Sequence, residues 1–140
     1  MANLSTSYMG FELKNPLIVG SSGLTNSVDS IREIEKNGAA ALVLKSLFEE
    51  QIHHLINKTM HGSADNFTYP EAEDYIGNYT KSKDVDDYLA LIKGAKEAVG
   101  IPVIASINCV SSTDWITFAT KIQNAGADGL ELNIFILPSD

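Results

Sequence analysis

The sequence has little cysteine, a deficit of positive charge and no long apolar run, and each shortage excludes a class of protein. Cys109 is the one cysteine among 140 residues, so no disulfide can form within the chain. Ten Lys and Arg residues stand against 18 Asp and Glu, which gives a formal net charge of −8. Nucleic acids and anionic membrane surfaces bind clustered basic side chains, so we expect neither as a partner.

The distribution of apolar residues narrows the possible classes of protein further. No apolar run approaches the ~20 residues of a membrane span, and residues 1–16 lack the pattern of a signal peptide. Hydrophobic residues make up 44% of the chain, which is enough for a sizeable core. We therefore expect a soluble, cytoplasmic α/β protein with a single domain over residues 1–140.

Short apolar runs alternate with amphipathic stretches along most of the chain. Two alternating pieces around Met9 and Gly10 predict a β-hairpin over residues 1–15. Residues 16–140 then read as consecutive β/α units, which predicts a parallel sheet with right-handed crossovers. The predicted strands are 16–23, 39–46, 101–110 and 127–137, and the predicted helices are 27–38, 84–100 and 111–126. Residues 49–84 are the least regular part and form a long excursion.

Polar residues stand where each predicted strand ends, and in α/β folds that edge of the sheet carries the site. Only Lys45 among them is charged, and it follows a buried strand and caps no helix. The serines and asparagines could instead cap the helices that follow them. Such an edge suits a planar, polar, partly anionic ligand, and we expect no metal site, which would need several Asp, Glu, His or Cys. The residues concerned are Ser21, Ser22, Gly23, Lys45, Ser46, Ser106, Asn108 and Asn133.

Four segments, in this order and spacing, resemble the N-terminal half of the dihydroorotate dehydrogenase family. They are NPLIVGSSG (15–23), LVLKS (42–46), VIASI (103–107) and LELN (130–133). The resemblance implies an FMN-dependent oxidoreductase that oxidises dihydroorotate to orotate in pyrimidine biosynthesis. It also implies a (β/α)8 TIM barrel closed at its bottom by a hairpin. This chain would supply that hairpin and the first four β/α units, a half-barrel.

The resemblance also implies roles for particular residues. Ser22, Gly23, Lys45, Ser46 and Asn133 match positions that contact the flavin, and Lys45 and Asn133 match positions that also contact the substrate. A lysine there would stabilise the negative charge of a reduced flavin and the carboxylate of a dihydroorotate-like substrate.

The chain departs from the family pattern at two places. The substrate-binding motif N-x-x-G-L-x-N is absent from the segment 62–78, where Asn66 or Asn78 is the candidate substitute. Ile136 or Leu137 stands where the family has a Ser or Cys base, and neither side chain accepts a proton, so no catalytic residue is assigned. The flavin half of the chemistry therefore fits better than the dihydroorotate half.

An eight-stranded barrel needs roughly 250 residues, so this chain corresponds to part of one. We expect FMN in the full-length parent and an inactive 140-residue chain. Because a half-barrel exposes two sheet edges, we also expect it to self-associate or to pair with the missing C-terminal half. Two alternatives stay open: a non-catalytic half-barrel that acts in assembly, and a flavin-free α/β barrel that binds a phosphorylated metabolite through Lys45.

Overall fold

The predicted alternation of strands and helices is present in the structure. A computed structural model describes residues 2–48, 70–109 and 112–134. Its elements are β1 (Thr6–Tyr8), β2 (Phe11–Leu13), β3 (Ile18–Val19), the 3-10 turn η1 (Gly23–Thr25), α1 (Val28–Lys36), β4 (Ala41–Val43), β5 (Leu47–Phe48), α3 (Pro70–Ala98), β6 (Val103–Asn108), α4 (Ser112–Ala125) and β7 (Gly129–Leu132).

The N-terminal hairpin is confirmed. Strands β1 and β2 pair antiparallel, with Tyr8 opposite Phe11. The two residues between them, Met9 and Gly10, both have positive φ, 52° and 81°. A two-residue turn of this kind matches the twist of the flanking strands, which explains why a hairpin forms here.

The remaining strands form one parallel sheet in which neighbours follow chain order. β3 pairs with β4, β4 and β5 both pair with β6, and β6 pairs with β7. Because β7 occupies one side of β6, β5 lies on the other side and continues the line of β4. Sequential order of this kind is how a TIM-type barrel begins, whereas a doubly wound sheet reverses its order. The described part is therefore compatible with half of such a barrel.

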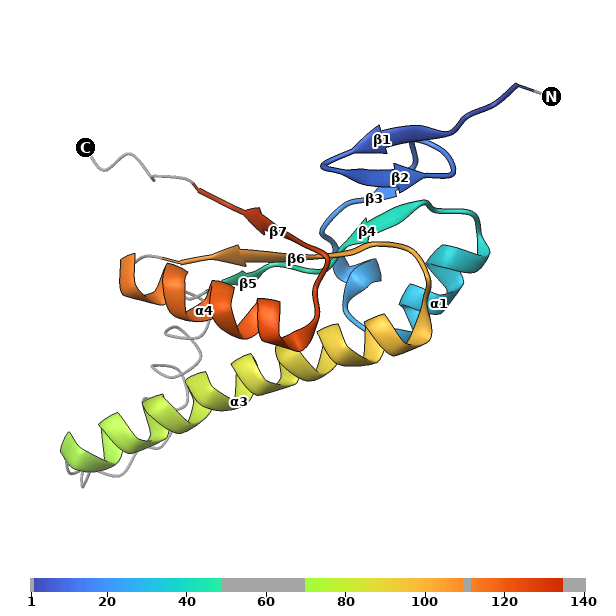
Figure 1. Cartoon of the computed structure of the whole chain (residues 1–140). Helices are drawn as coiled ribbons and strands as arrows, with labels where there is room; N and C mark the ends of the chain where they lie inside the picture. The colour runs from blue at the N-terminus through green and yellow to red at the C-terminus, as the bar shows by residue number, and fades with distance from the viewer. Residues whose placement is uncertain (1, 49–69, 110–111, 135–140) are drawn as a thin grey trace, which may run out of the picture.

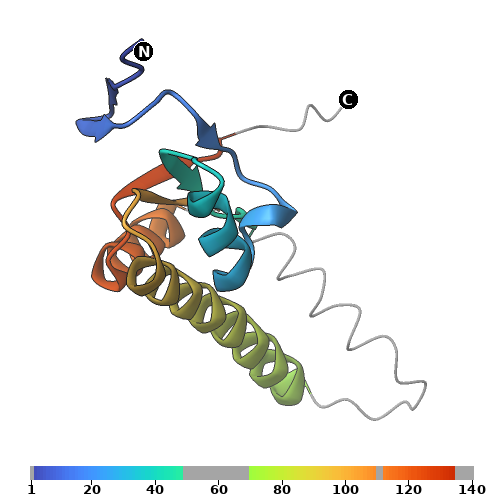
Figure 2. The same cartoon turned by 90° about the vertical axis from the view of Figure 1, so that its right-hand side faces the viewer.

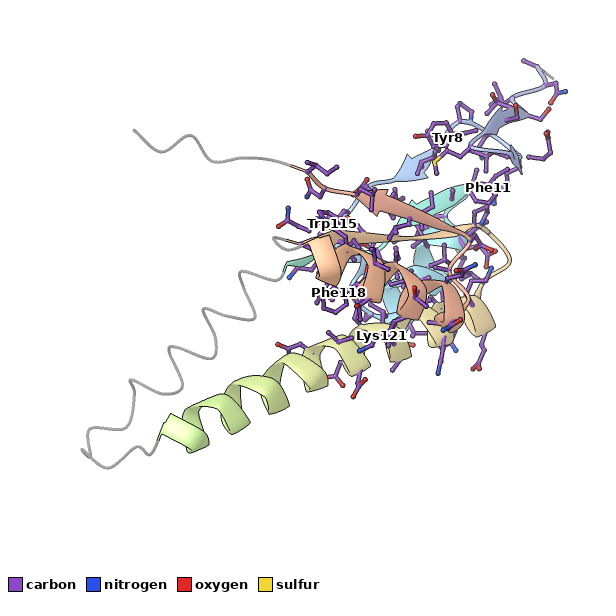
Figure 3. The ribbon with its side chains drawn as sticks, turned by 60° about the vertical axis from the view of Figure 1, so that its left-hand side comes forward. Tyr8, Phe11, Trp115, Phe118 and Lys121 are labelled. Carbon is purple, nitrogen blue, oxygen red and sulfur yellow. The ribbon has the colours of Figure 1, made fainter. Side chains whose placement is uncertain are left out.

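The sheet has one covered face and one open face. Helices α1, α3 and α4 lie on one side, and the hairpin lies on the other (Figures 1 and 2). Trp115 and Phe118 of α4 belong to the helix side, while Tyr8 and Phe11 belong to the hairpin (Figure 3). Fully buried residues of the helix-side core include Ile31, Leu42, Leu44, Ile92, Val103, Ala105 and Ile107.

Helix α1 begins and ends where the sequence predicts. The Ser27 side chain accepts a hydrogen bond from the Ser30 N–H at the helix start. Gly38, just after the helix, has φ +99°, and Gly126 after α4 has φ +93°. L-residues other than glycine seldom adopt this conformation, so glycine ends both helices.

The prediction of an irregular segment over residues 49–84 is wrong for its last part, which is helical from Pro70 onward. Helix α3 begins at Pro70, not at Asp84, and its first turns extend past the edge of the sheet (Figure 1). Proline is well tolerated at the first helical position, which explains how Pro70 can start the helix. Residues 49–69 lie outside the described part of the chain. In the part that is described, no helix combines the length and apolar character needed to cross a membrane.

Candidate functional site

Polar residues at the ends of the parallel strands meet at one edge of the sheet. Ser21 and Ser22 follow β3, Lys45 and Ser46 follow β4, and Asn133 follows β7. Ser106 and Asn108 lie in the C-terminal half of β6, and Asn108 is its last residue. Because the strands run parallel, these residues share the C-terminal edge, and together we call them the rim. The rim is where the sequence placed the site.

A row of hydrogen-bonded side chains crosses the sheet at this edge. The Ser46 N–H donates to Ser21 Oγ at 2.9 Å, and the hydroxyls of these two serines are 3.3 Å apart. Ser46 Oγ also pairs with Ser106 Oγ, which donates to Glu131 Oε1 at 2.6 Å. We call these four residues, Ser21, Ser46, Ser106 and Glu131, the hydroxyl row. It links every strand of the sheet.

The strand that carries Lys45 is bulged. Val43 stands opposite Ile104, but Leu47 stands opposite Ile107, so four steps along one strand match three along its neighbour. The extra residue re-aims the chain, as bulges beside functional sites do. The Lys45 N–H points away from β6 and donates to the Thr25 carbonyl at 3.4 Å. The bulge therefore brings Lys45 against the turn formed by residues 22–25.

Tyr88 of α3 meets β6 beside the bulge. Its hydroxyl donates to the Ser106 carbonyl at 3.0 Å and accepts from the Ser106 N–H at 2.8 Å. Burial raises the pKa of Tyr88 from 10 to about 12; the hydrogen bond from Ser106 lowers it, and the charge of Glu131 raises it. The phenol is therefore protonated at neutral pH and can donate.

Lys45 is exposed, so its charge does not carry the cost of burial although it directly follows a buried strand. Among the described residues, no carboxylate lies within ion-pair distance of its amine. Ser22 does what the alternative interpretation allowed: its side chain accepts from the Leu24 N–H at 3.3 Å and caps η1. Asn108 Nδ2 donates to the main-chain carbonyl of Asn133 at 2.5 Å.

A cavity lies on the open face below the rim, between the hairpin and the sheet. Its lining residues are Tyr8, Met9, Ile18, Val43, Ile104, Leu130 and Glu131. Apart from Glu131, these side chains are largely apolar. The cavity therefore offers an apolar wall with one carboxylate at its edge toward the rim.

Sequence reasoning missed Glu131 and Tyr88. Glu131 could have been found, because it stands two residues before Asn133 in the predicted strand 127–137 and so on the same face of that strand. Tyr88 gave no sequence signal, since helical spacing marks it only as core. Asn66, Ile136 and Leu137 lie outside the described residues.

No protein-family profile matches the chain. The chain is 29% identical over 139 residues to a dihydroorotate dehydrogenase B (NAD(+)), catalytic subunit, of Thermoplasma acidophilum, and 27% identical over 141 residues to the same subunit of Thermoplasma volcanium. Each match covers 96% of this chain and 42% of the relative. The resemblance to the N-terminal half of the dihydroorotate dehydrogenase family is thus confirmed, and the chain spans less than half the length of these relatives.

Proposed function

We propose that this chain forms the N-terminal part of the flavin site in an FMN-dependent oxidoreductase related to dihydroorotate dehydrogenase. The observation that carries the proposal is the placement of Lys45. The bulge sets this lysine beside the turn at Ser22 and Gly23, so residues that match flavin contacts in two separate strands become neighbours. Similarity over 96% of the chain supports the same family.

The donor chemistry of the rim fits a flavin. Lys45 supplies one cation, while hydroxyls and amides of Ser46, Asn108 and Asn133 supply groups that suit ring carbonyls and nitrogens. FMN, when bound, would accept the hydride equivalent that the substrate loses. Lys45 would act by holding positive charge where negative charge develops, and its exposure leaves the amine available for that contact.

The substrate we propose is dihydroorotate or a similar planar ring with a carboxylate. Lys45 and Asn133 would contact it, and Asn66 is the further candidate from the excursion. The base is not assigned, because Ile136 and Leu137 cannot accept a proton. Location in the cytoplasm and a role in pyrimidine biosynthesis follow from the same proposal.

Replacement of Lys45 tests the proposed role. In the protein at its full genomic length, Lys45→Ala should slow flavin reduction by ~10²–10³, the effect of removing a group aimed at developing charge. Stopped-flow absorbance would measure the rate. The free energy of unfolding should change by less than about 0.5 kcal/mol, because the side chain is exposed.

Lys36→Ala is the matched control. Lys36 is 74% exposed, pairs with Glu33 at 3.2 Å and ends α1, at the opposite edge of the sheet. Its replacement should leave flavin reduction unchanged. Equal rates for wild type and Lys45→Ala would remove Lys45 from the mechanism.

A further inference from the structure

The bulge between β4 and β5 leaves a gap in the backbone pairing of the sheet. Leu44 N–H donates to the Ile104 carbonyl at 2.8 Å, so alternate residues of β6 direct their backbone groups toward β4. Ser106 is the next residue in that series. Its N–H and carbonyl face the bulge, where Lys45 has turned away to pair with Thr25.

The Tyr88 hydroxyl fills this gap with both of its hydrogen-bonding functions. It accepts from the Ser106 N–H and donates to the Ser106 carbonyl, so one side-chain atom replaces the two missing ladder bonds. Ser106 is fully buried, and unpaired backbone groups there would be costly. The bulged arrangement is therefore compatible with a buried strand only because Tyr88 is present.

The regular register is the competing arrangement. Without the bulge, the register that pairs Val43 with Ile104 would continue along both strands. Lys45 would then stand opposite Ser106, the position that Ser46 takes in the bulged strand. A one-residue slip turns each side chain to the other face, so Ser46 would leave the hydroxyl row. Lys45 would then lose its contact with the turn at residues 22–25.

We infer that Tyr88 is a positioning residue that selects the bulged register and thereby sets Lys45 at the rim. It acts through the backbone of Ser106 and reaches neither cofactor nor substrate. The consequence for cofactor binding rests on the proposed function, whereas the consequence for the sheet does not.

Tyr88→Phe in the 140-residue chain tests the consequence for the sheet. It removes the hydroxyl and keeps the ring. Backbone amide exchange, followed by NMR, should become at least tenfold faster at Ser106 and Lys45, while Leu44 in the regular ladder keeps its wild-type rate. Tyr8→Phe, on the exposed side of the hairpin, is the matched control and should change none of the three. Unchanged exchange at Ser106 and Lys45 in a folded Tyr88→Phe chain would overturn the inference.

A second measurement needs no variant, in case Tyr88→Phe does not fold. The hydroxyl proton of Tyr88 in the wild-type chain should exchange slowly and show a through-space contact with the Ser106 amide proton. A freely exchanging hydroxyl with no such contact would overturn the inference as well.

FMN titration of the protein at its full genomic length tests the consequence for cofactor binding. Tyr88→Phe should weaken FMN binding at least tenfold, and Lys36→Ala, at the opposite edge of the sheet, should leave it unchanged. If wild type binds FMN and Tyr88→Phe binds it equally well, the positioning role is wrong. If wild type binds no FMN, the proposed function fails, and the amide exchange experiment still decides the role of Tyr88.

Discussion

At the residue scale, the site depends on side chains that satisfy one another. Ser106 pairs through its hydroxyl with Ser46 and Glu131, and through its backbone with Tyr88. Ser106→Ala would remove the hydrogen bonds to Ser46 and Glu131, but the Ser46 hydroxyl keeps Ser21 as a neighbour and Glu131 is exposed to water, so we expect a cost of about 1 kcal/mol. Ser106 and Glu131 thus form a connected support for the rim.

The raised pKa of Tyr88 predicts a loss of stability at high pH. Its pKa is about 12 in the folded chain and about 10 in the unfolded one, so the folded state holds the proton more tightly. The resulting stabilisation is complete below pH ~10 and declines as the pH rises through ~12, by about 2–3 kcal/mol in all. Urea denaturation at several pH values would measure it.

Tyr88→Phe provides the comparison for this pH dependence, because other tyrosines and lysines also titrate there. The wild-type chain should lose more unfolding free energy above pH ~10 than the variant does, by about 2 kcal/mol. Tyr8→Phe should behave as wild type. Parallel curves for wild type and Tyr88→Phe would contradict the buried, protonated phenol.

At the element scale, close packing of α1 on α3 depends on Gly94. A Cβ at this position would lie 2.9 Å from Val28 Cγ2, closer than real contacts allow. Exposed glycines inside helices usually gain roughly 0.5–1 kcal/mol when replaced by alanine. We predict the opposite sign here: Gly94→Ala should destabilise the chain, because Val28 is stiff at χ1 and cannot easily turn away.

Removal of the Val28 side chain checks this explanation. In the Val28→Ala background, Gly94→Ala should become stabilising, as helix propensity then acts alone. Urea denaturation of the four chains in this double-mutant cycle gives the coupling free energy. A Gly94→Ala effect of equal sign in both backgrounds would show that the contact does not matter.

The elements that could be predicted from sequence are those with local signals. Ser27 at the start of α1 and Gly38 after it define the helix by capping chemistry, and Met9 and Gly10 define the hairpin turn. The β4–β5 bulge could not be predicted, because its stability depends on Tyr88 from a distant helix. The start of α3 at Pro70 was missed because proline suits both a turn and a first helical turn.

The candidate site, like the fold, could be predicted from the sequence only in part. Parallel strands place Lys45 and Asn133 at one edge, so alternation of strands and helices was enough to gather them. The hydrogen bond from Lys45 N–H to Thr25 depends on the register of β4 against β6, which no local pattern encodes. The role of Ser22 as a cap of η1 was foreseen as the alternative to a flavin contact.

At the scale of the whole molecule, the sheet keeps an apolar groove beside the edge strand β3. Residues of β3 and α1 line it together with Leu17 and Leu24, which are 62% and 67% exposed. Unpaired strand edges associate with other chains. We predict that the 140-residue chain sediments as more than a monomer, and that Leu17→Lys shifts it toward monomer. A monomeric wild-type chain at the same concentration would contradict this.

The 140-residue chain alone should bind FMN weakly and should not oxidise dihydroorotate. In TIM-type barrels the phosphate site commonly involves loops after the seventh and eighth strands, and these 140 residues match 42% of the length of their relatives. Fluorescence quenching on titration with FMN would measure the affinity. A micromolar dissociation constant for the chain alone would mean that these residues hold the phosphate as well as the ring.

The flavin content of the protein at its full genomic length tests the central claim most directly. Purified protein should show the visible absorption spectrum of a flavin, and acid denaturation should release about one FMN per polypeptide, as expected for a single rim built around Lys45. A colourless protein that gains no flavin spectrum when FMN is added would contradict the account.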